Sequence, residues 1–287
     1  MNYSESYRHG TQVLSAAGVS EAALDARLLL EFLTGCEPGW LYAHPDAQMN
    51  EDMPERYERL LERRAAHIPL QHITGTCSFM GIDFFVNDSV LIPRQDSECL
   101  VEEAMRYVND GSDILDLCTG SGCLLLSLMH YKNGCRGVGT DISEDALAVA
   151  KKNLGMLEKS GGLNGGNVRL LQGDLYDALA GADERFDYII SNPPYIRSRV
   201  IPELMPEVRD HEPITALDGG ADGLDFYKRI TEDAAKFLRG GGMIFFEIGF
   251  DQADEVVHML ELAGFKDISV VRDYGGNDRV VKGYRHV

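Results

Sequence analysis

The chain is predicted to form an α/β fold, with a parallel sheet covered by helices on both faces behind a small helical domain. The main observation is a rhythm of strand, loop and helix that begins near residue 93 and separates five strand candidates. Such alternation favours parallel strands joined by helical crossovers. Two further candidates, separated by residues 273–278, predict a closing hairpin. The seven candidates are Asp113–Leu117, Arg136–Thr140, Val168–Gln172, Tyr188–Ser191, Met243–Ile248, Ile268–Arg272 and Arg279–Gly283.

Residues 1–72 are predicted to be the helical domain. Apolar side chains recur near the 3.6-residue period over residues 21–33, which predicts a helix that Ser20 caps and Gly35 ends. A second helix is predicted over residues 53–67, where an apolar stripe runs through a segment rich in Glu and Arg.

Residues 73–92 have a different character. Aromatic and β-branched residues alternate there around two turn sites, Met80-Gly81 and Asn87-Asp88. This pattern predicts a β-hairpin that links the helical domain to a second domain over residues 93–287.

The composition excludes some classes of protein. The net charge of −19 argues against bare nucleic acid as the main partner, because phosphate contacts need Lys and Arg. No apolar stretch reaches the roughly 18–20 residues of a membrane helix, and the first ten residues lack a signal region. The six cysteines form no Cys-x-x-Cys pair or zinc-type cluster, so no metal site is expected. We therefore expect a cytoplasmic protein, and a monomer because no heptad pattern is present.

A glycine-rich loop follows the first strand of the predicted sheet. It reads Asp116-Leu117-Cys118-Thr119-Gly120-Ser121-Gly122, and an apolar helix begins at Cys123. Glycines in such a loop let the backbone turn sharply and approach a ligand at a helix N-terminus. A lone loop of this kind is also compatible with a simple tight turn between strand and helix.

Acidic residues end the next two strands. Asp141 lies about 20 residues beyond the loop, where a carboxylate accepts hydrogen bonds from ribose hydroxyls. Asp174 ends the third strand, where it could accept from an adenine amine while Leu175 packs on the ring. Each aspartate alone could instead be a helix N-cap. Together they predict a nucleotide-like cofactor at the carboxyl ends of the strands.

The fourth strand ends in Asn192-Pro193-Pro194-Tyr195, which suits methylation of a planar nitrogen. Such a nitrogen is a poor nucleophile, so a protein can only grip its two N–H bonds and aim it at an electrophilic methyl. The Asn192 oxygen can accept one N–H and the Pro193 carbonyl the other, since prolines fix φ and donate no N–H. Tyr195 offers a flat face. Asn-Pro and Pro-Pro are also common turn and loop signals.

These features together favour S-adenosylmethionine over a nicotinamide cofactor, which would fit the same fold. Asp116 precedes the glycines, Asp174 ends the third strand, and the amide grip of Asn192 would lie beside the reactive methyl. No Tyr/Lys or His/Asp pair has a spacing that suggests hydride transfer.

The chain resembles the HemK/PrmC family, the protein-(glutamine-N(5)) methyltransferases that modify peptide chain release factors. The resemblance covers nearly the full length, and its most specific parts are Ile92-Pro93-Arg94 and Asn192-Pro193-Pro194-Tyr195 taken together. It also includes residues 69–75, the glycine loop, Asp141-Ile142-Ser143, Glu212-Pro213, residues 219–224, Glu247-Ile248-Gly249 and residues 278–281.

Four positions depart from the family pattern. The family usually has Pro where this chain has Gln95, and Ser97 replaces a Thr while keeping the hydroxyl. Cys118 replaces the usual first glycine of the cofactor loop, which is tolerable if its φ is negative. The position of Leu175 is often an aromatic ring.

The resemblance implies a class I S-adenosylmethionine-dependent methyltransferase with a Rossmann-like seven-stranded sheet. The implied substrate is the glutamine in the Gly-Gly-Gln loop of class-1 release factors, recognised by the helical domain, with no direct nucleic-acid or membrane partner. The implied cofactor-binding residues are Cys118, Thr119, Gly120, Ser121, Gly122, Asp141, Ile142, Asp174, Leu175 and Asn192. The implied substrate-binding residues are Asn192, Pro193, Pro194 and Tyr195, of which Asn192, Pro193 and Tyr195 are catalytic.

Other readings remain open at this point. A nucleic-acid methyltransferase acting on an exocyclic amine of adenine or guanine uses similar motifs for the same physical reason, although the charge disfavours it. A cofactor-binding module without catalysis would leave the Asn-Pro-Pro-Tyr motif unexplained. Arg94 and Glu98 either shape the pocket or form a surface ion pair, and Glu247 is either a supporting or a structural residue.

Overall fold

The computed structural model describes residues 2–37, 39–181 and 183–286, and the chain divides into two compact units. One unit comprises the chain up to Thr76 together with Met205–His211, and the other comprises Cys77–Leu204 and the chain from Glu212 onward. The hairpin expected as a separate linker thus groups with the second unit. Met205–His211, expected within the second domain, groups with the first.

The first unit is helical. Leu14, Leu29, Leu30 and Leu61 are fully buried at its centre, and the Tyr57 hydroxyl donates to the Ala26 carbonyl at 2.9 Å. The elements are α1 (Tyr3–Ala16), α2 (Ala22–Thr34), α3 (Trp40–Ala43), α4 (Met53–Ala65), α5 (Leu70–Thr74) and α9 (Pro206–Arg209).

The ends of α2 test two predictions. Gly35 ends the helix in the left-handed region, with φ 67°, and its N–H donates to the Glu31 carbonyl, as predicted. The prediction that Ser20 caps the helix is wrong, because Glu21 holds the N-cap position and makes no side-chain capping bond. The helix begins one residue later than the period suggested, which removes Ser20 from reach of the free amides.

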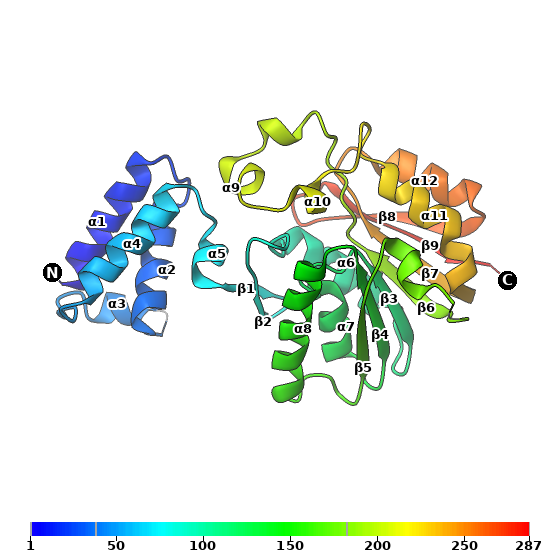
Figure 1. Cartoon of the computed structure of the whole chain (residues 1–287), viewed down its shortest axis with the longest axis horizontal. Coiled ribbons are helices and arrows are strands. Elements are labelled where there is room, and N and C mark those ends of the chain that lie inside the picture. Colours follow the sequence, from blue (N-terminus) through cyan, green and yellow to red (C-terminus); the bar gives the residue numbers. More distant parts are fainter. Residues whose placement is uncertain (1, 38, 182, 287) are drawn as a thin grey trace. The chain divides into compact units, whose positions relative to one another are not determined.

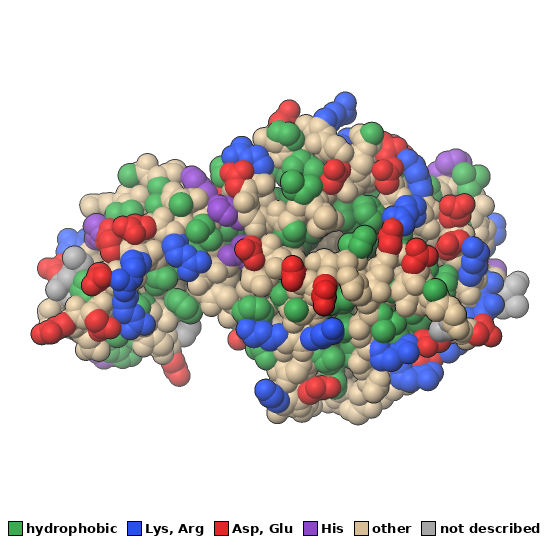
Figure 2. Space-filling model, in the orientation of Figure 1, with side chains coloured by type: hydrophobic (Ala, Val, Ile, Leu, Met, Phe, Trp, Pro, Cys, Tyr) green, Lys and Arg blue, Asp and Glu red, His purple; other side chains and the backbone are tan. Residues whose placement is uncertain are grey.

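Charged side chains organise α4. On its exposed face Arg56 pairs with Asp52 and Arg59 with Glu55, each four residues apart. Acidic and basic side chains are accordingly mixed over the visible face of this unit (Figure 2). The buried Arg64 instead bonds Asp25 of α2 at 2.7 Å and Glu207 of α9 at 3.1 Å, and so ties three helices together.

The second unit contains a seven-stranded sheet of order β5-β4-β3-β6-β7-β9-β8, which confirms the predicted fold class. The pairs from β5 to β7 are parallel, whereas β9 runs antiparallel to both β7 and β8. The strands are β3 (Asp113–Leu117), β4 (Arg136–Asp141), β5 (Asn167–Gln172), β6 (Phe186–Ser191), β7 (Leu238–Glu247), β8 (Phe265–Arg272) and β9 (Asp278–Arg285).

Alternate residues of each strand face opposite sides of the sheet. Ile114, Ile190 and Phe245 belong to one buried cluster, and Leu115, Ile189 and Phe246 to the other. Figure 1 shows α6 (Gln95–Met105), α7 (Cys123–Tyr131) and α8 (Glu144–Lys159) on one side of the sheet, and α11 (Asp225–Phe237) and α12 (Ala253–Leu262) on the other. Both faces are therefore covered, as the near-continuous apolar runs of the strands require.

The predicted hairpin is present as β1 (Thr76–Phe79) and β2 (Ile82–Phe85). The Asn153 side chain of α8 accepts from Phe85 N at 2.7 Å and donates to Phe85 O at 3.0 Å and Ser121 O at 2.9 Å. One amide thus joins the hairpin, α8 and the loop after β3. No helix in the described ranges is long and apolar enough to cross a membrane.

Two glycines in helices should respond to alanine in opposite directions. A Cβ on Gly10 of α1 would lie 2.1 Å from Tyr57 Oη, so Gly10→Ala should lower the free energy of unfolding by about 1–3 kcal/mol through overpacking. A Cβ on Gly155 of α8 meets nothing within 4 Å, so Gly155→Ala should raise it by about 0.5–1 kcal/mol. Denaturant unfolding of both variants measures this; equal stability would contradict the close contact at Gly10.

Candidate active site

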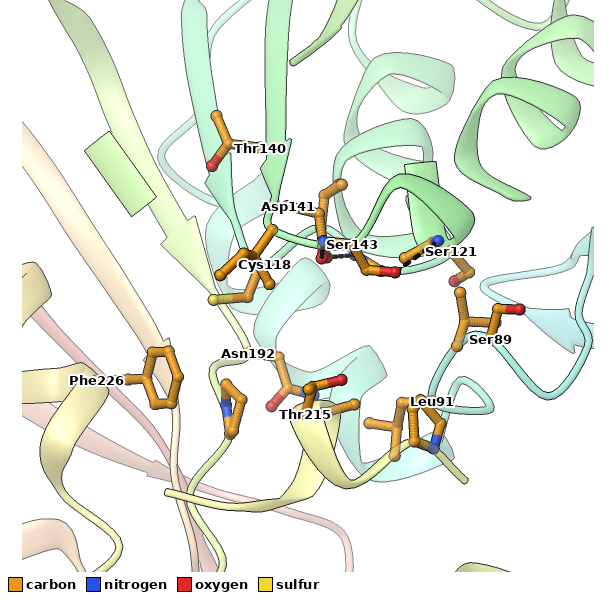
Figure 3. Close-up of a pocket in the computed structure, with 18 of the residues that line it drawn as sticks. Ser89, Leu91, Cys118, Ser121, Thr140, Asp141, Ser143, Asn192, Thr215 and Phe226 are labelled. Atoms are coloured by element: carbon orange, nitrogen blue, oxygen red, sulfur yellow. Dashed lines mark hydrogen bonds between the residues drawn. The ribbon is translucent and has the colours of Figure 1, made fainter. Parts of the chain in front are cut away.

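Loops at the carboxyl ends of β3, β4, β5 and β6 line one cavity of about 360 Å³. Because the order of strands reverses between β3 and β6, this edge is where open α/β sheets bind ligands. Figure 3 shows Ser121, Asp141 and Ser143 on one side of the cavity, Asn192 and Thr215 opposite, Ser89 and Leu91 at one end and Phe226 at the other.

Most of the predicted site residues line this cavity. Gly122, Pro193 and Tyr195 are not among its lining residues. Those that line it are Cys118, Thr119, Gly120, Ser121, Asp141, Ile142, Asp174, Leu175, Asn192 and Pro194.

The loop after β3 turns through several left-handed residues. Gly120 and Gly122 have φ of 54° and 82°, and Gly122 is the N-cap of α7. Cys118 has φ 62°, so the negative φ that would make a side chain readily tolerable at this position is not present. A side chain in this conformation costs roughly 1–2 kcal/mol, and the buried surroundings of the loop hold it there. Leu175, after β5, has φ 54° as well.

Asp116, in β3, supports the same loop through a hydrogen bond. It is fully buried, and Thr119 Oγ1 donates to its Oδ2 at 2.6 Å. Within the described part of the chain, Asp116 Oδ1 has no hydrogen-bond partner. Burial raises the pKa of Asp116 to about 7, against the opposing effect of the Thr119 hydrogen bond. Asp116 is not among the residues lining the cavity, and it acts on the cavity through Thr119.

Asp141 joins two loops at the cavity. Its Oδ2 accepts from Gly120 N and its Oδ1 from Ser143 N, both at 2.9 Å. Burial raises the pKa of Asp141, although these backbone hydrogen bonds act in the other direction. Each carboxylate oxygen has further lone pairs, so Asp141 can also accept from ligand hydroxyls.

Asp174 is paired with a residue that the sequence did not indicate. Arg229 of α11 bonds Asp174 Oδ2 at 2.7 Å, and both residues line the cavity. Phe226, one turn earlier on α11, lines the cavity too. Nothing in the local sequence distinguishes this face of α11 from an ordinary amphipathic helix, so only the packing of the helix identifies these residues.

The Asn-Pro-Pro-Tyr loop is held at several points after β6. Ser191 Oγ donates to Leu117 O at 2.7 Å, which fixes the start of the loop against β3. Asn192 Nδ2 donates to Ser97 Oγ at 3.4 Å. The Tyr195 hydroxyl donates to Glu247 Oε1 at 3.3 Å. Burial raises the pKa of Tyr195, and the negative charge of the nearby Glu247 raises it further. Tyr195 therefore faces a buried carboxyl, and its flat face is not part of the cavity lining.

Two segments complete the cavity walls. Leu91 and Pro93 form one, and Pro213 with α10 (Ile214–Leu217) forms the other. Glu212 links them, because its side chain accepts from Arg94 Nη2 at 2.7 Å and from Ile92 N at 3.3 Å. Burial raises the pKa of Glu212, while Arg94 opposes that effect.

Glu98 has a different place from Arg94. Its Oε1 accepts from Met80 N at 2.6 Å, at the turn of the hairpin. The sequence thus indicated the segment but not its function: Arg94 supports a wall of the cavity from outside, and Glu98 holds the hairpin turn.

The residues present fit a nucleoside-containing cofactor. A cavity of this size is within the range of ligand sites, and its walls combine apolar side chains with a few polar groups. Asp141 and Asp174 supply acceptors at the ends of adjacent strands, and residues at the start of α7 line the same space. Among the described residues, no group of three or more His, Cys, Asp or Glu could hold a metal ion.

Comparison with known proteins identifies the family. A family model described as the PrmC N-terminal domain matches residues 5–75, and one described as a methyltransferase domain matches residues 114–211. A release factor glutamine methyltransferase from Clostridium acetobutylicum is 41% identical over 264 residues, which cover 91% of this chain and 90% of that protein. The chain belongs to the release factor glutamine methyltransferase family.

Further relatives agree with this family. A release factor glutamine methyltransferase from Geobacter sulfurreducens is 41% identical over 270 residues, or 94% of this chain and 92% of that protein. The crystal structure of a methyltransferase from Pyrococcus furiosus has a TM-score of 0.54 and 18% identity, covering 81% of this chain and 99% of that chain. At this identity the likeness concerns the fold alone, and it agrees with the class I methyltransferase fold.

The backbone strain at Cys118 can be measured with two variants. Both Cys118→Gly and Cys118→Ala remove the sulfur, but only Gly relieves the left-handed conformation, so Gly should be the more stable by about 1 kcal/mol. Cys135 is a matched control, since it is buried without a positive φ, and there Ala should be the more stable. Denaturant unfolding of the four variants decides; a more stable Ala at position 118 would contradict the strain.

Asp116→Asn should stabilise the ligand-free protein increasingly at high pH. The protonated Asp116 contributes its full stability below about pH 4, the unfolded value, and that contribution is lost as the pH rises through about 7. The variant keeps a neutral group, so its advantage in free energy of unfolding should grow by about 2.5 kcal/mol between pH 5 and 8.

Asp110→Asn is the control for this experiment. Hydrogen bonds from Asn133 lower the pKa of Asp110, so this carboxylate is ionised at both pH values and the difference from wild type should stay constant. A constant difference for Asp116→Asn as well would contradict the raised pKa of Asp116.

Proposed function

We propose that this protein transfers a methyl group from S-adenosylmethionine to the side-chain amide nitrogen of the glutamine in the Gly-Gly-Gln motif of class-1 release factors. The observation that carries the proposal is the position of Asn192, whose amide lines the same cavity as the loop after β3 and the acidic residues after β4 and β5. An amide grip beside a cofactor cavity is the arrangement that methylation of a planar nitrogen requires. Relatives that are 41% identical over most of the chain carry this activity in their names.

The cofactor would be held by residues of the chain's own loops. When bound, S-adenosylmethionine supplies an electrophilic methyl group on a positively charged sulfur. Asp141 would accept from the ribose hydroxyls, and Asp174 with Leu175 would face the adenine. The loop from Cys118 to Gly122 would bring its backbone close to the rest of the cofactor.

Asn192 would orient the acceptor nitrogen. Its Oδ1 accepts one N–H of the substrate amide, and the Pro193 carbonyl accepts the other, so that the lone pair points at the methyl. The gain in rate comes mainly from this orientation and from the exclusion of water. The two acceptors also stabilise the positive charge that develops on the nitrogen. The nitrogen then becomes acidic enough to lose its proton without a dedicated base.

The helical unit would recognise the protein substrate. It is the part matched by the PrmC N-terminal domain, and it is separate from the unit that contains the cavity. A negatively charged chain would attract a basic partner, with strong dependence on salt. We expect a monomer that acts in the cytoplasm, where release factors act.

A second candidate function is methylation of an exocyclic amine of adenine or guanine. The observation in its favour is the same Asn192 amide, which would grip a base amine as well as a glutamine amide. The net charge of −19 disfavours a nucleic-acid substrate.

The decisive assay follows labelled methyl transfer from S-adenosylmethionine to a release factor, to its Gly-Gly-Gln variant with Gln→Ala, and to total DNA and RNA. Label on the wild-type factor and none on the Gln→Ala factor is the expected result. Label on nucleic acid alone would overturn the proposed substrate.

Asn192→Ala should lower the rate of methyl transfer about 100-fold or more, because one acceptor for the substrate N–H is lost. Cofactor binding, measured by calorimetry, should persist. Asn192→Asp keeps acceptor oxygens and should retain more activity than Ala. Asn109→Ala is the control, because Asn109 is exposed and precedes the amino end of β3, whereas the cavity lies at the carboxyl ends of the strands. A near-normal rate for Asn192→Ala would contradict the mechanism.

A further inference from the structure

Behind Asn192 lies a buried group of polar side chains that the proposed chemistry does not yet use. Ser97, in the first turn of α6, and Glu247, the last residue of β7, are each only 2% exposed. Ser97 lines the cavity and accepts from Asn192 Nδ2 at 3.4 Å. Glu247 accepts from Tyr195 at 3.3 Å. Buried polar groups of this kind need hydrogen-bond partners, so each group here must act either as donor or as acceptor toward its neighbour.

The number of protons on each group decides which group donates and which accepts. Asn192 Nδ2 can only donate, so Ser97 Oγ must accept there and send its single proton elsewhere. Glu247 can accept the hydrogen bond that Ser97 then donates, because its Oε2 is buried and has no hydrogen-bond partner in the part of the chain that the structure describes. Burial raises the pKa of Glu247, and the nearby Ser97 hydroxyl is the largest effect that lowers it again.

Other groups fix the Glu247 carboxyl in place. The Tyr227 hydroxyl donates to the Glu247 main-chain carbonyl at 2.8 Å, and the Tyr195 hydroxyl contacts the side chain. The positive charge of Arg279 also favours the ionised carboxylate. Arg279 is itself held by Asp273 at 3.0 Å and Asp96 at 3.2 Å. The acceptor end of the chain of hydrogen bonds is therefore anchored to β7, α11 and β9.

We propose that Ser97 and Glu247 are positioning residues that hold the Asn192 amide with its oxygen toward the acceptor nitrogen. The proposal rests on the proposed function, since it assigns the supports of the amide that grips the substrate. In this arrangement the Ser97 hydroxyl donates a hydrogen bond to Glu247. Ser97 Oγ then accepts a hydrogen bond from Asn192 Nδ2, and Asn192 Oδ1 is left to face the cavity. The opposite orientation would present an N–H to the substrate N–H and could not hold it.

This arrangement predicts an effect on turnover and not on cofactor binding. Ser97→Ala removes the acceptor that selects one amide orientation, so kcat should fall about tenfold, which is the weight of one hydrogen bond. Ser97→Thr keeps the hydroxyl and should stay within about threefold of the wild type. Glu247→Gln has nearly the same shape but offers N–H groups, which send the Ser97 proton toward Asn192 and favour the wrong orientation. It should lower kcat at least as much as Ser97→Ala.

The experiment measures kcat, KM and cofactor affinity for the wild type, these three variants and the Ser97→Ala/Glu247→Gln double variant. Because Glu247 acts through Ser97, the double variant should be no slower than the slower single variant. Ser127→Ala is the control, since Ser127 is a fully buried serine whose hydroxyl has no partner among the described residues. Its kcat should equal that of the wild type.

The wild-type arm separates this proposal from the proposed function. Whether label reaches the release factor or nucleic acid decides the substrate, and the variants are then ranked on whichever acceptor the wild type labels. Wild-type kcat in Ser97→Ala and Glu247→Gln would overturn the positioning role. Multiplied losses in the double variant, or losses that appear equally in cofactor affinity, would overturn it as well.

Discussion

The parallel pairing of β3 with β4 on one side and β6 on the other is the constraint on which the site depends. Leu117 pairs with Thr140 and with Ser191, so the three strands end level with one another. The Ser191 hydroxyl bonds Leu117 O across the last of these pairs. The glycine-rich loop, Asp141 and Asn192 follow directly from those strand ends. A slip of one residue in either pair would turn these side chains to the other face of the sheet.

Three buried carboxyls then organise the loops around this edge. Asp116 accepts a hydrogen bond from Thr119 in the loop after β3, and Glu247 accepts one from the Tyr195 hydroxyl. Glu212 joins two walls of the cavity. Burial raises the pKa of all three. A buried carboxyl tolerates few arrangements of its neighbours, because an unpaired charge in the interior is costly. These groups therefore restrict the loops to one geometry while their main effect on the chemistry is indirect.

Much of the fold was predictable because it follows from short-range patterns. The apolar runs of the strands identified all seven, with ends that differ by a few residues, and Gly35 marked the end of α2. The failures lie where neighbours override local preference. Ser20 is a good capping residue, but α2 begins at Ala22, and Cys118 adopts φ 62° although a side chain disfavours it. Tertiary packing decided both positions.

The sequence by itself determined the class of the sheet and the order in which its strands and loops follow one another. It also supplied the residues that we propose grip a planar amide. These depend on hydrophobic periodicity and on the chemistry of individual side chains, which are local properties. Only the tertiary structure decided that Arg229 and Phe226 of α11 line the cavity and that Glu212 joins its walls. It also decided that Ser97 contacts Asn192 and that Glu247 contacts Tyr195. Those contacts join residues more than 50 positions apart, and their existence depends on how helices pack on the sheet, which no local pattern records.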